Sequence, residues 1–392
     1  MAKALYAEAH AALGLESCMA LMDLQAFFDS MDLAKLFSAS INRAYALRIL
    51  LLAFSSFLSP RVLKADGWIA APVFPGRSIT AGETSGVEMA RTLLYDTLAW
   101  LHQRYPLVNA QQWIDDLVLY LAGTTLHITR VLPSAVAGLS RRFNSLGLYF
   151  ASKSRIVASS RELAALVRNL LGRRGVIVQD APVSSDLGLD QRGGRAGPQP
   201  KAATRRKAAA RRTASIFRLN ATRPVARLLV RTGPCAAEAY ALKATGASYA
   251  QIAEMRRVQA KTIVQVRPLM CLTSMYAAAT KHVKEDPLLG APWAFLEEWL
   301  RLWYSDGYMR VLVRSAWPRV LERVRAQDPK VRWRLSTGSL SGVIITLLER
   351  GWDPRSPDLW LAPDVAATEW RFGEFDAAGP VIDLEPFLLA FS

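Results

Sequence analysis

A basic segment without acidic residues, residues 191–231, divides the chain into two parts of ordinary composition. This basic segment holds twelve Lys or Arg and no Asp or Glu, and it opens with Gly193, Gly194 and Pro198. Because its charges repel one another, it cannot supply a core of its own, and it predicts a boundary between two folded regions. Its second half, residues 201–219, is rich in Ala and Arg and lacks Gly and Pro, which favours a helix once an anion or a partner offsets the repulsion.

The charge of the whole chain indicates a polyanionic partner. The 392 residues include 49 Lys or Arg and 33 Asp or Glu, which gives a net charge of +16. Nucleic acid is the leading candidate for the partner, and an anionic membrane surface is the alternative. A basic run is by default a solvated or disordered linker, but its cations can also bind phosphates and release counterions. The candidate nucleic-acid-binding residues in its helical half are Arg205, Arg206, Lys207, Arg211 and Arg212.

The sequence predicts an intracellular protein, either nuclear or cytoplasmic. The longest apolar stretch, residues 49–58, is too short to cross a bilayer, so we expect no transmembrane helix. The first twenty residues lack the basic start, apolar middle and cleavage site of a secretory signal. Cys18, Cys235 and Cys271 are odd in number and far apart, which predicts reduced, buried thiols.

Residues 1–190 predict a mixed α+β domain. Apolar residues recur at helical spacing in some stretches and form short strand-like runs in others. The helical patterns cover residues 33–58 and 87–101, and the strand-like runs cover residues 17–24, 111–121 and 148–157. Gly147 is expected to end the helix before the last of these runs.

Residues 233–392 predict a separate, mainly helical domain. Helical patterns cover residues 236–244, 249–260 and 292–304. The tryptophans of this region recur near helical spacing and are expected to form its core rather than a platform for stacking bases. They are Trp293, Trp299, Trp303 and Trp317.

Three aspartates lie where strands are expected to end. Asp23 closes an apolar run, and Asp115 and Asp116 lie between two strand-like runs, which is typical of a hairpin tip. Taken alone, such a pair is more often a solvated turn, because Asp is a favoured turn residue. Carboxylates on neighbouring strands can also hold the two divalent cations that transfer of a phosphoryl group to a 3′-hydroxyl requires, and Mg²⁺ needs no His or Cys ligand.

The order of these motifs resembles that of reverse transcriptases of the non-LTR retrotransposon (LINE-like) kind. The matching segments are residues 23–29, 81–85, 113–116, 147–154 and 186–188. They resemble, in turn, the family's first catalytic motif, its Gln-Gly motif, its aromatic-x-Asp-Asp motif, its Gly-Leu and Lys motif, and the Leu-Gly turn of its primer grip. Trp113 stands where the family usually has Tyr or Phe, and the glutamine of the second motif is missing.

The resemblance implies a catalytic role for four residues. Asp23 and Asp115 would be the principal ligands of two Mg²⁺ ions, which Mn²⁺ could replace, and Asp116 would be a supporting carboxylate. Lys153 would lie near the triphosphate, as a positive charge or as a proton donor to the departing pyrophosphate.

Two further residues would contact the nucleotide. Phe28 would be a steric gate that rejects a ribose 2′-hydroxyl and so favours deoxynucleotides. Gly82 would let the backbone approach the template or the nucleotide closely, because it has no Cβ.

The resemblance therefore implies an RNA-directed DNA polymerase that uses an RNA template, a DNA primer and dNTP. Its palm, an antiparallel sheet with helices packed on one face, would occupy residues 1–190. Residues 191–232 would be a basic connector or thumb-like helix, and residues 233–392 a helical domain of unassigned role. Only 22 residues precede Asp23, so most of the fingers region is expected to be absent. No protein partner or membrane partner is predicted. The alternative is a catalytically inactive, retroelement-derived nucleic-acid-binding protein.

Overall fold

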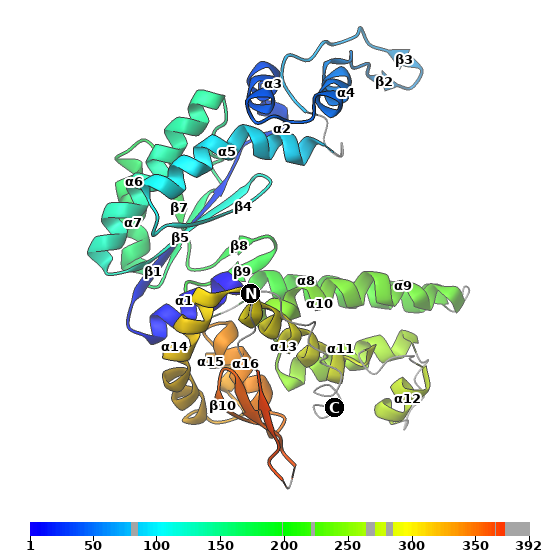
Figure 1. The fold of residues 1–392 in the computed structure, drawn as a ribbon. Helices are drawn as coiled ribbons and strands as arrows, with labels where there is room; N and C mark the ends of the chain where they lie inside the picture. The colour runs from blue at the N-terminus through cyan, green and yellow to red at the C-terminus, as the bar shows by residue number, and fades with distance from the viewer. Residues whose placement is uncertain are drawn as a thin grey trace. The chain divides into compact units, whose positions relative to one another are not determined.

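The protein forms two compact units. In a computed structural model, residues 17–184 form one unit, the sheet unit, and residues 1–16 with 185–392 form the other, the helical unit (Figure 1). The structure describes residues 1–79, 85–197, 199–220, 224–263, 271–279, 285–364 and 366–372. This division differs from the predicted domain over residues 1–190, because the first sixteen residues belong to the helical unit.

The sheet unit is built on a five-stranded sheet with the order β4-β5-β1-β6-β7. The strands are β1 (Glu16–Asp23), β4 (Asn109–Trp113), β5 (Asp116–Gly123), β6 (Arg155–Ala158) and β7 (Gln179–Asp180). β1 pairs antiparallel with β6, and β4 pairs antiparallel with β5, whereas β7 adds a parallel edge to β6. The predicted strand at 17–24 is confirmed by β1, whereas the run at 111–121 contains parts of two strands, β4 and β5, joined by a hairpin loop. The third strand is shorter than residues 148–157, because a turn occupies residues 151–154.

Helices complete the sheet unit. They are α2 (Phe27–Ser30), α3 (Leu33–Asn42), α4 (Leu47–Leu58), α5 (Gly86–Arg104), α6 (Thr125–Leu146) and α7 (Arg161–Gly172), and a small hairpin is formed by β2 (Lys64–Ala65) and β3 (Trp68–Ile69). The helical pattern over residues 33–58 is therefore two helices. Thr124 caps the start of α6, because its side chain accepts a hydrogen bond from the N–H of His127, and Gly147, with φ of 84°, caps its end. Gly147 thus ends this helix as predicted, because glycine adopts the left-handed conformation without a Cβ penalty.

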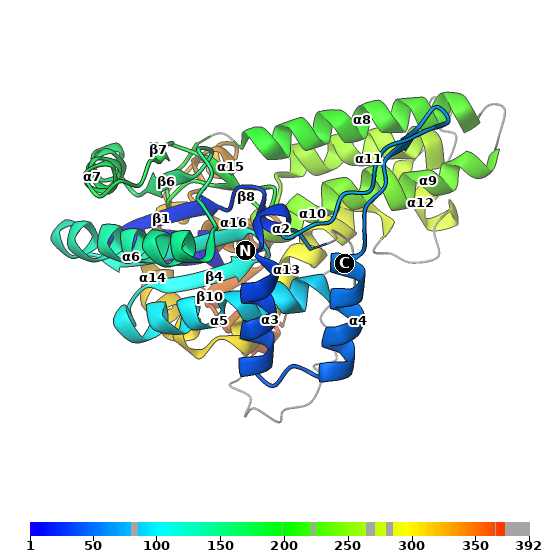
Figure 2. The ribbon, with the colours of Figure 1, turned by 90° about the horizontal axis from the view of Figure 1, so that it is seen from above.

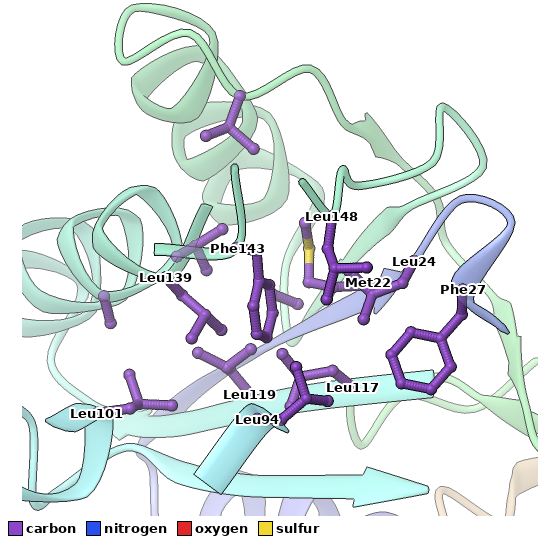
Figure 3. Close-up of a cluster of buried hydrophobic side chains, with 14 of the residues drawn as sticks. Met22, Leu24, Phe27, Leu94, Leu101, Leu117, Leu119, Leu139, Phe143 and Leu148 are labelled. Atoms are coloured by element: carbon purple, nitrogen blue, oxygen red, sulfur yellow. The ribbon is translucent and has the colours of Figure 1, made fainter. Parts of the chain in front are cut away.

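One face of the sheet is covered by α5, α6 and α7. Alternate residues of β1 and β5, including Met22 and Leu117, pack in one buried cluster with side chains from these helices, such as Leu94 and Phe143 (Figure 3). Successive side chains of a strand point to opposite faces. Asp23 and Asp116, which follow Met22 and precede Leu117, therefore lie on the face of the sheet opposite to this core.

The helical unit consists mainly of helices, as predicted. They are α1 (Ala2–Ala12), α8 (Pro200–Asn220), α9 (Leu228–Val230), α10 (Ala236–Thr245), α11 (Tyr249–Ile263), α12 (Leu272–Ala279), α13 (Pro287–Ser305), α14 (Gly307–Arg325), α15 (Arg332–Leu335) and α16 (Ser339–Leu348), with the 3-10 helix η1 (Pro224–Arg227) and the π-helix η2 (Arg231–Cys235). Its strands are β8 (Ser184–Asp186) and β9 (Leu189–Gln191), which pair with each other, and β10 (Asp353–Ser356), β11 (Leu359–Leu361) and β12 (Glu369–Arg371), which form a second sheet. The four tryptophans predicted as core are all buried.

A buried carboxylate fastens α1 to the rest of the helical unit. The Glu8 side chain has no exposed surface. Its Oε2 accepts hydrogen bonds from the N–H of Leu340 at 2.7 Å and of Ser341 at 3.2 Å, at the start of α16. Its Oε1 accepts from the Thr337 hydroxyl at 2.6 Å and from the Arg323 guanidinium at 3.2 Å. These contacts are the physical reason why the first residues belong to the helical unit.

The basic segment supplies α8, which confirms the helix predicted over residues 201–219. α8 lies along α10 and α11 (Figure 2). Its buried residues, Ala202, Ala209, Thr213 and Asn220, recur at helical spacing on the side that packs against the unit. The predicted connector is thus mainly a packed helix whose opposite face is exposed.

The predictions about membranes and cysteines are met in part. Among the helices that the structure describes, none is long and apolar enough to span a membrane. All three cysteines are free thiols, and Cys18 is buried in β1. The expectation of three buried thiols is wrong for Cys271, which is exposed because it lies just outside the first turn of α12, and Cys235 is half-buried.

Candidate active site

Lys153 forms an ion pair with Asp23 at the end of β1. Lys153 Nζ lies 2.8 Å from Asp23 Oδ1, and the side chains are 68% and 13% exposed, respectively. Lys153 belongs to a tight turn in which the N–H of Ser154 donates to the carbonyl of Ala151 at 3.0 Å. The N–H of Ala151 donates in turn to the Asp23 carbonyl at 2.8 Å, which fixes the turn beside the strand.

Ser154 supports this arrangement from the interior. Its side chain is buried, and its Oγ accepts a hydrogen bond from the N–H of Asp23 at 3.3 Å. Sequence reasoning did not single out Ser154 for this role. The only signal in the sequence was its place directly after Lys153.

The Asp115–Asp116 pair lies beside Asp23, because β5 and β1 are neighbours in the sheet. The N–H of Leu24 donates to the Asp115 carbonyl at 3.3 Å, which brings the start of β5 to the end of β1. Trp113 pairs with Asp116, so Ile114 and Asp115 form the two-residue loop of a hairpin. The hairpin tip predicted from the sequence is confirmed, and Asp116 is the first residue of β5.

The hairpin loop holds a strained backbone. Ile114 has φ of 58°, a conformation that is unfavourable for a β-branched residue although two-residue hairpins require it at this position. The Gln112 side-chain amide donates to the Ile114 carbonyl at 2.8 Å and stabilises the loop. Local strain of this kind costs about 1–3 kcal/mol and is frequent at functional sites.

The carboxylates act together on one ammonium group. The pKa of Lys153 is raised, first by its hydrogen bond to Asp23 and then by the charges of Asp23, Asp115 and Asp116. Lys153 therefore stays protonated at neutral pH. The structure thus brings four residues from three separate segments within electrostatic reach of one another.

The donor chemistry of this cluster suits a hard divalent cation, since every carboxylate ligand is an oxygen donor. As the side chains stand, however, no three Asp, Glu, His or Cys side chains among the described residues are gathered closely enough to hold a metal ion. Asp23 Oδ1 is instead engaged by the Lys153 ammonium.

Of the two residues predicted to contact the nucleotide, only Phe28 belongs to the part of the chain that the structure describes. Phe28 lies on α2, half-buried against the core, with its ring centroid 5.3 Å from that of Phe27. The Phe28 carbonyl accepts a hydrogen bond from the N–H of Ile79 at 3.0 Å. Gly82 lies outside the described residues. The steric-gate role of Phe28 and the role of Gly82 stay predictions.

The predicted nucleic-acid-binding residues of α8 fall into two groups. Arg205 is partly buried: its Nη2 donates to the Gly188 carbonyl at 3.0 Å, and its guanidinium lies over the Tyr240 ring at 4.9 Å. Arg206 is also half-buried. The exposed cations of the prediction are Lys207, Arg211 and Arg212.

Comparisons with known proteins leave the family open. No protein-family model matches the chain, and neither does any curated protein. Among solved structures, the chain is similar to telomerase from Candida albicans, determined in complex with a TWJ fragment of telomeric RNA, at a TM-score of 0.39 and 10% identity. The overlap covers 86% of this chain and 54% of the other, so the chain spans about half the length of that protein. Similarity at this level does not establish a common fold.

Proposed function

We propose that the protein is an RNA-directed DNA polymerase of the reverse-transcriptase type and that the sheet unit is its palm. The observation that supports this most is the convergence of Asp23, Asp115, Asp116 and Lys153 at the end of β1. These residues were singled out from sequence motifs that are widely separated along the chain. Two of them, Asp23 and Asp116, lie on the face of the sheet opposite to the helix-covered core.

The three aspartates and Lys153 would have different roles in nucleotidyl transfer. Two Mg²⁺ ions, when bound, would activate the primer 3′-hydroxyl and stabilise the leaving pyrophosphate. Asp23 and Asp115 would hold these ions, and the charge of Asp116 would support them. Lys153, kept protonated by these carboxylates, would move from Asp23 to the pyrophosphate and supply a positive charge or a proton there.

Primer extension on an RNA template tests this proposal. With dNTP and Mg²⁺, the protein should extend an annealed DNA primer, and Asp23→Asn or Asp115→Asn should reduce the rate by roughly 10²-fold or more. Asp66→Asn is the matched control, because Asp66 is exposed in the β2–β3 hairpin and Asn tolerates its φ of 46°. A wild-type protein that extends no primer, or site variants that extend as well as the control, would refute the proposal.

The second candidate is a non-catalytic nucleic-acid-binding protein that keeps the fold and the positive charge. It is favoured by the ion pair that occupies Asp23 and by the exposed cations of α8. It predicts salt-sensitive RNA binding that survives Asp23→Asn and Asp115→Asn, without primer extension by the wild type.

A further inference from the structure

The helical unit contains a large basic cavity, the basic pocket, in which Arg206 of the basic segment lies beside residues that the sequence did not connect with it. Its volume is about 1280 Å³, which exceeds the range of roughly 300–1,000 Å³ typical of small-molecule sites. Its walls come from the segment before α8, from α8 itself, from the α10–α11 connection, and from α15 and the end of α16. The size favours a short stretch of a polymer over one small ligand.

The lining of the basic pocket is strongly positive. Five cations face one carboxylate, Glu349. The cations are Arg192, Arg206, Lys330, Arg332 and Arg334. This excess of positive charge predicts a ligand with several negative charges, such as a chain of phosphates.

Several of these cations have hydrogen-bonding capacity left for a ligand. Arg332 uses its Nε to donate to the Val324 carbonyl at 3.1 Å, which fixes the side chain and leaves its terminal nitrogens available. Arg206 is half-buried and forms no hydrogen bond or ion pair of its own with the part of the chain that the structure describes. Burial lowers the pKa of Arg206, although Glu238 and Asp190 act against this at longer range. A half-buried guanidinium of this kind gains more from a phosphate than a fully exposed one does.

Two aromatic side chains adjoin the cations. The Trp333 Nε1 donates to Glu349 Oε1 at 2.9 Å, which fixes the ring in the wall of the pocket. The ring lies against Gly246, where an added Cβ would come within 2.6 Å of it, so only glycine permits this approach. Tyr249, at the start of α11, is 62% exposed. Flat rings beside cations can stack on unpaired bases while the cations hold the phosphates.

We propose that the basic pocket binds single-stranded nucleic acid. Phosphates would contact Arg206, Arg332 and Arg334, and a base would stack on Trp333 or Tyr249. A single strand is favoured over a duplex, because paired bases do not present their faces to aromatic side chains. This inference concerns the helical unit alone and stands whether or not the sheet unit is a polymerase.

Binding of a short fluorescein-labelled oligo(U), followed by fluorescence anisotropy in EDTA and without dNTP, tests this proposal separately from catalysis. Arg206→Gln and Arg334→Gln should each weaken binding and lower the slope of log Kd against log salt concentration by about 0.7, as expected for one lost phosphate contact on a single strand. Trp333→Leu should raise Kd roughly fivefold to a hundredfold, whereas Trp333→Phe should retain most of the affinity. Arg257→Gln, an exposed change on α11 outside the pocket, should have no such effect.

Three results would overturn the proposal. The first is an unchanged Kd and salt slope in both Arg206→Gln and Arg334→Gln, because the cations on the outer face of α8 would then account for all binding. The second is equal competition by a duplex of the same sequence. The third is competition by inorganic triphosphate as strong as that by unlabelled oligo(U), which would assign a small polyphosphate to the pocket. The arginine variants keep the test decisive if Trp333→Leu fails to fold, since neither arginine packs in the core.

Discussion

The buried carboxylate of Glu8 allows a quantitative test of how the helical unit is held together. Glu8→Gln keeps the size of the side chain and removes its charge. Oε2 faces the N–H groups of Leu340 and Ser341, and Oε1 faces the Thr337 hydroxyl and the Arg323 guanidinium. An amide nitrogen in place of Oε2 would face two backbone N–H groups. In place of Oε1 it could donate to the Thr337 hydroxyl, which can rotate to accept, but it would still face the Arg323 guanidinium, so no orientation of the glutamine keeps all four hydrogen bonds.

Glu8→Gln is expected to lower the unfolding free energy of the helical unit by about 3 kcal/mol. Removing one partner of a buried ion pair costs about 3–5 kcal/mol. The lower end of this range applies because the Arg323 side chain is 39% exposed and regains water when its partner is lost. For a unit of this size, the change corresponds to a fall in Tm of roughly 6–12 °C.

Denaturant unfolding followed by tryptophan fluorescence measures the loss of unfolding free energy in the helical unit. The fully buried tryptophans, among them Trp299, Trp303 and Trp317, belong to the helical unit and report on its unfolding. Glu322→Gln, an exposed change on α14, is the control and should alter the unfolding free energy by less than about 0.5 kcal/mol. If Glu8→Gln behaved like this control, the structural role given to Glu8 would be wrong.

Three further predictions address the hairpin, the pH response and the ion pair. Because Ile114 has positive φ, Ile114→Gly should be more stable than Ile114→Ala by about 1 kcal/mol in urea unfolding, the reverse of the order expected in a regular strand. Burial lowers the pKa of His10, so the unfolded chain binds more protons than the folded protein at acidic pH. The contribution of neutral His10 to the unfolding free energy should therefore be fully present above about pH 6.5 and decrease as the pH falls below that value. His10→Gln should lack this pH dependence when both proteins are unfolded in denaturant at several pH values. Lys153→Met should raise the affinity for Mn²⁺ up to about fivefold in calorimetric titration, because the exposed ammonium that competes for Asp23 is worth at most about 1 kcal/mol; a weaker affinity would contradict the competition.

Local patterns in the sequence predicted much of the sheet unit. The apolar run that ends at Asp23 forms a central strand, and the Asp-Asp pair lies at a hairpin because strand-like runs flank it. Gly147 was predictable in the same way, because the end of a helix is determined by the residues next to it. That the aspartates would meet was implied instead by the resemblance to reverse transcriptases, because no local pattern shows that β1 and β5 are neighbours in the sheet.

Features that depend on distant contacts were not predictable in this way. The assignment of α1 to the helical unit rests on Glu8 and on residues more than three hundred positions further along the chain, and no periodic pattern signals such a contact. The basic pocket likewise combines side chains from segments around Arg206, Gly246 and Trp333. The charge of the basic segment indicated an anionic partner, but not that Arg206 would turn inward while Lys207 stays exposed.

The central proposal is that carboxylates from β1 and from the β4–β5 hairpin would bind the same divalent cations. Isothermal titration of Mn²⁺ into the wild type, Asp23→Asn, Asp115→Asn and the control Asp66→Asn tests this directly. We expect each site variant to weaken binding by about tenfold or more, and the control to leave it unchanged. Equal Mn²⁺ affinity in all four proteins, or no binding by the wild type, would contradict the claim.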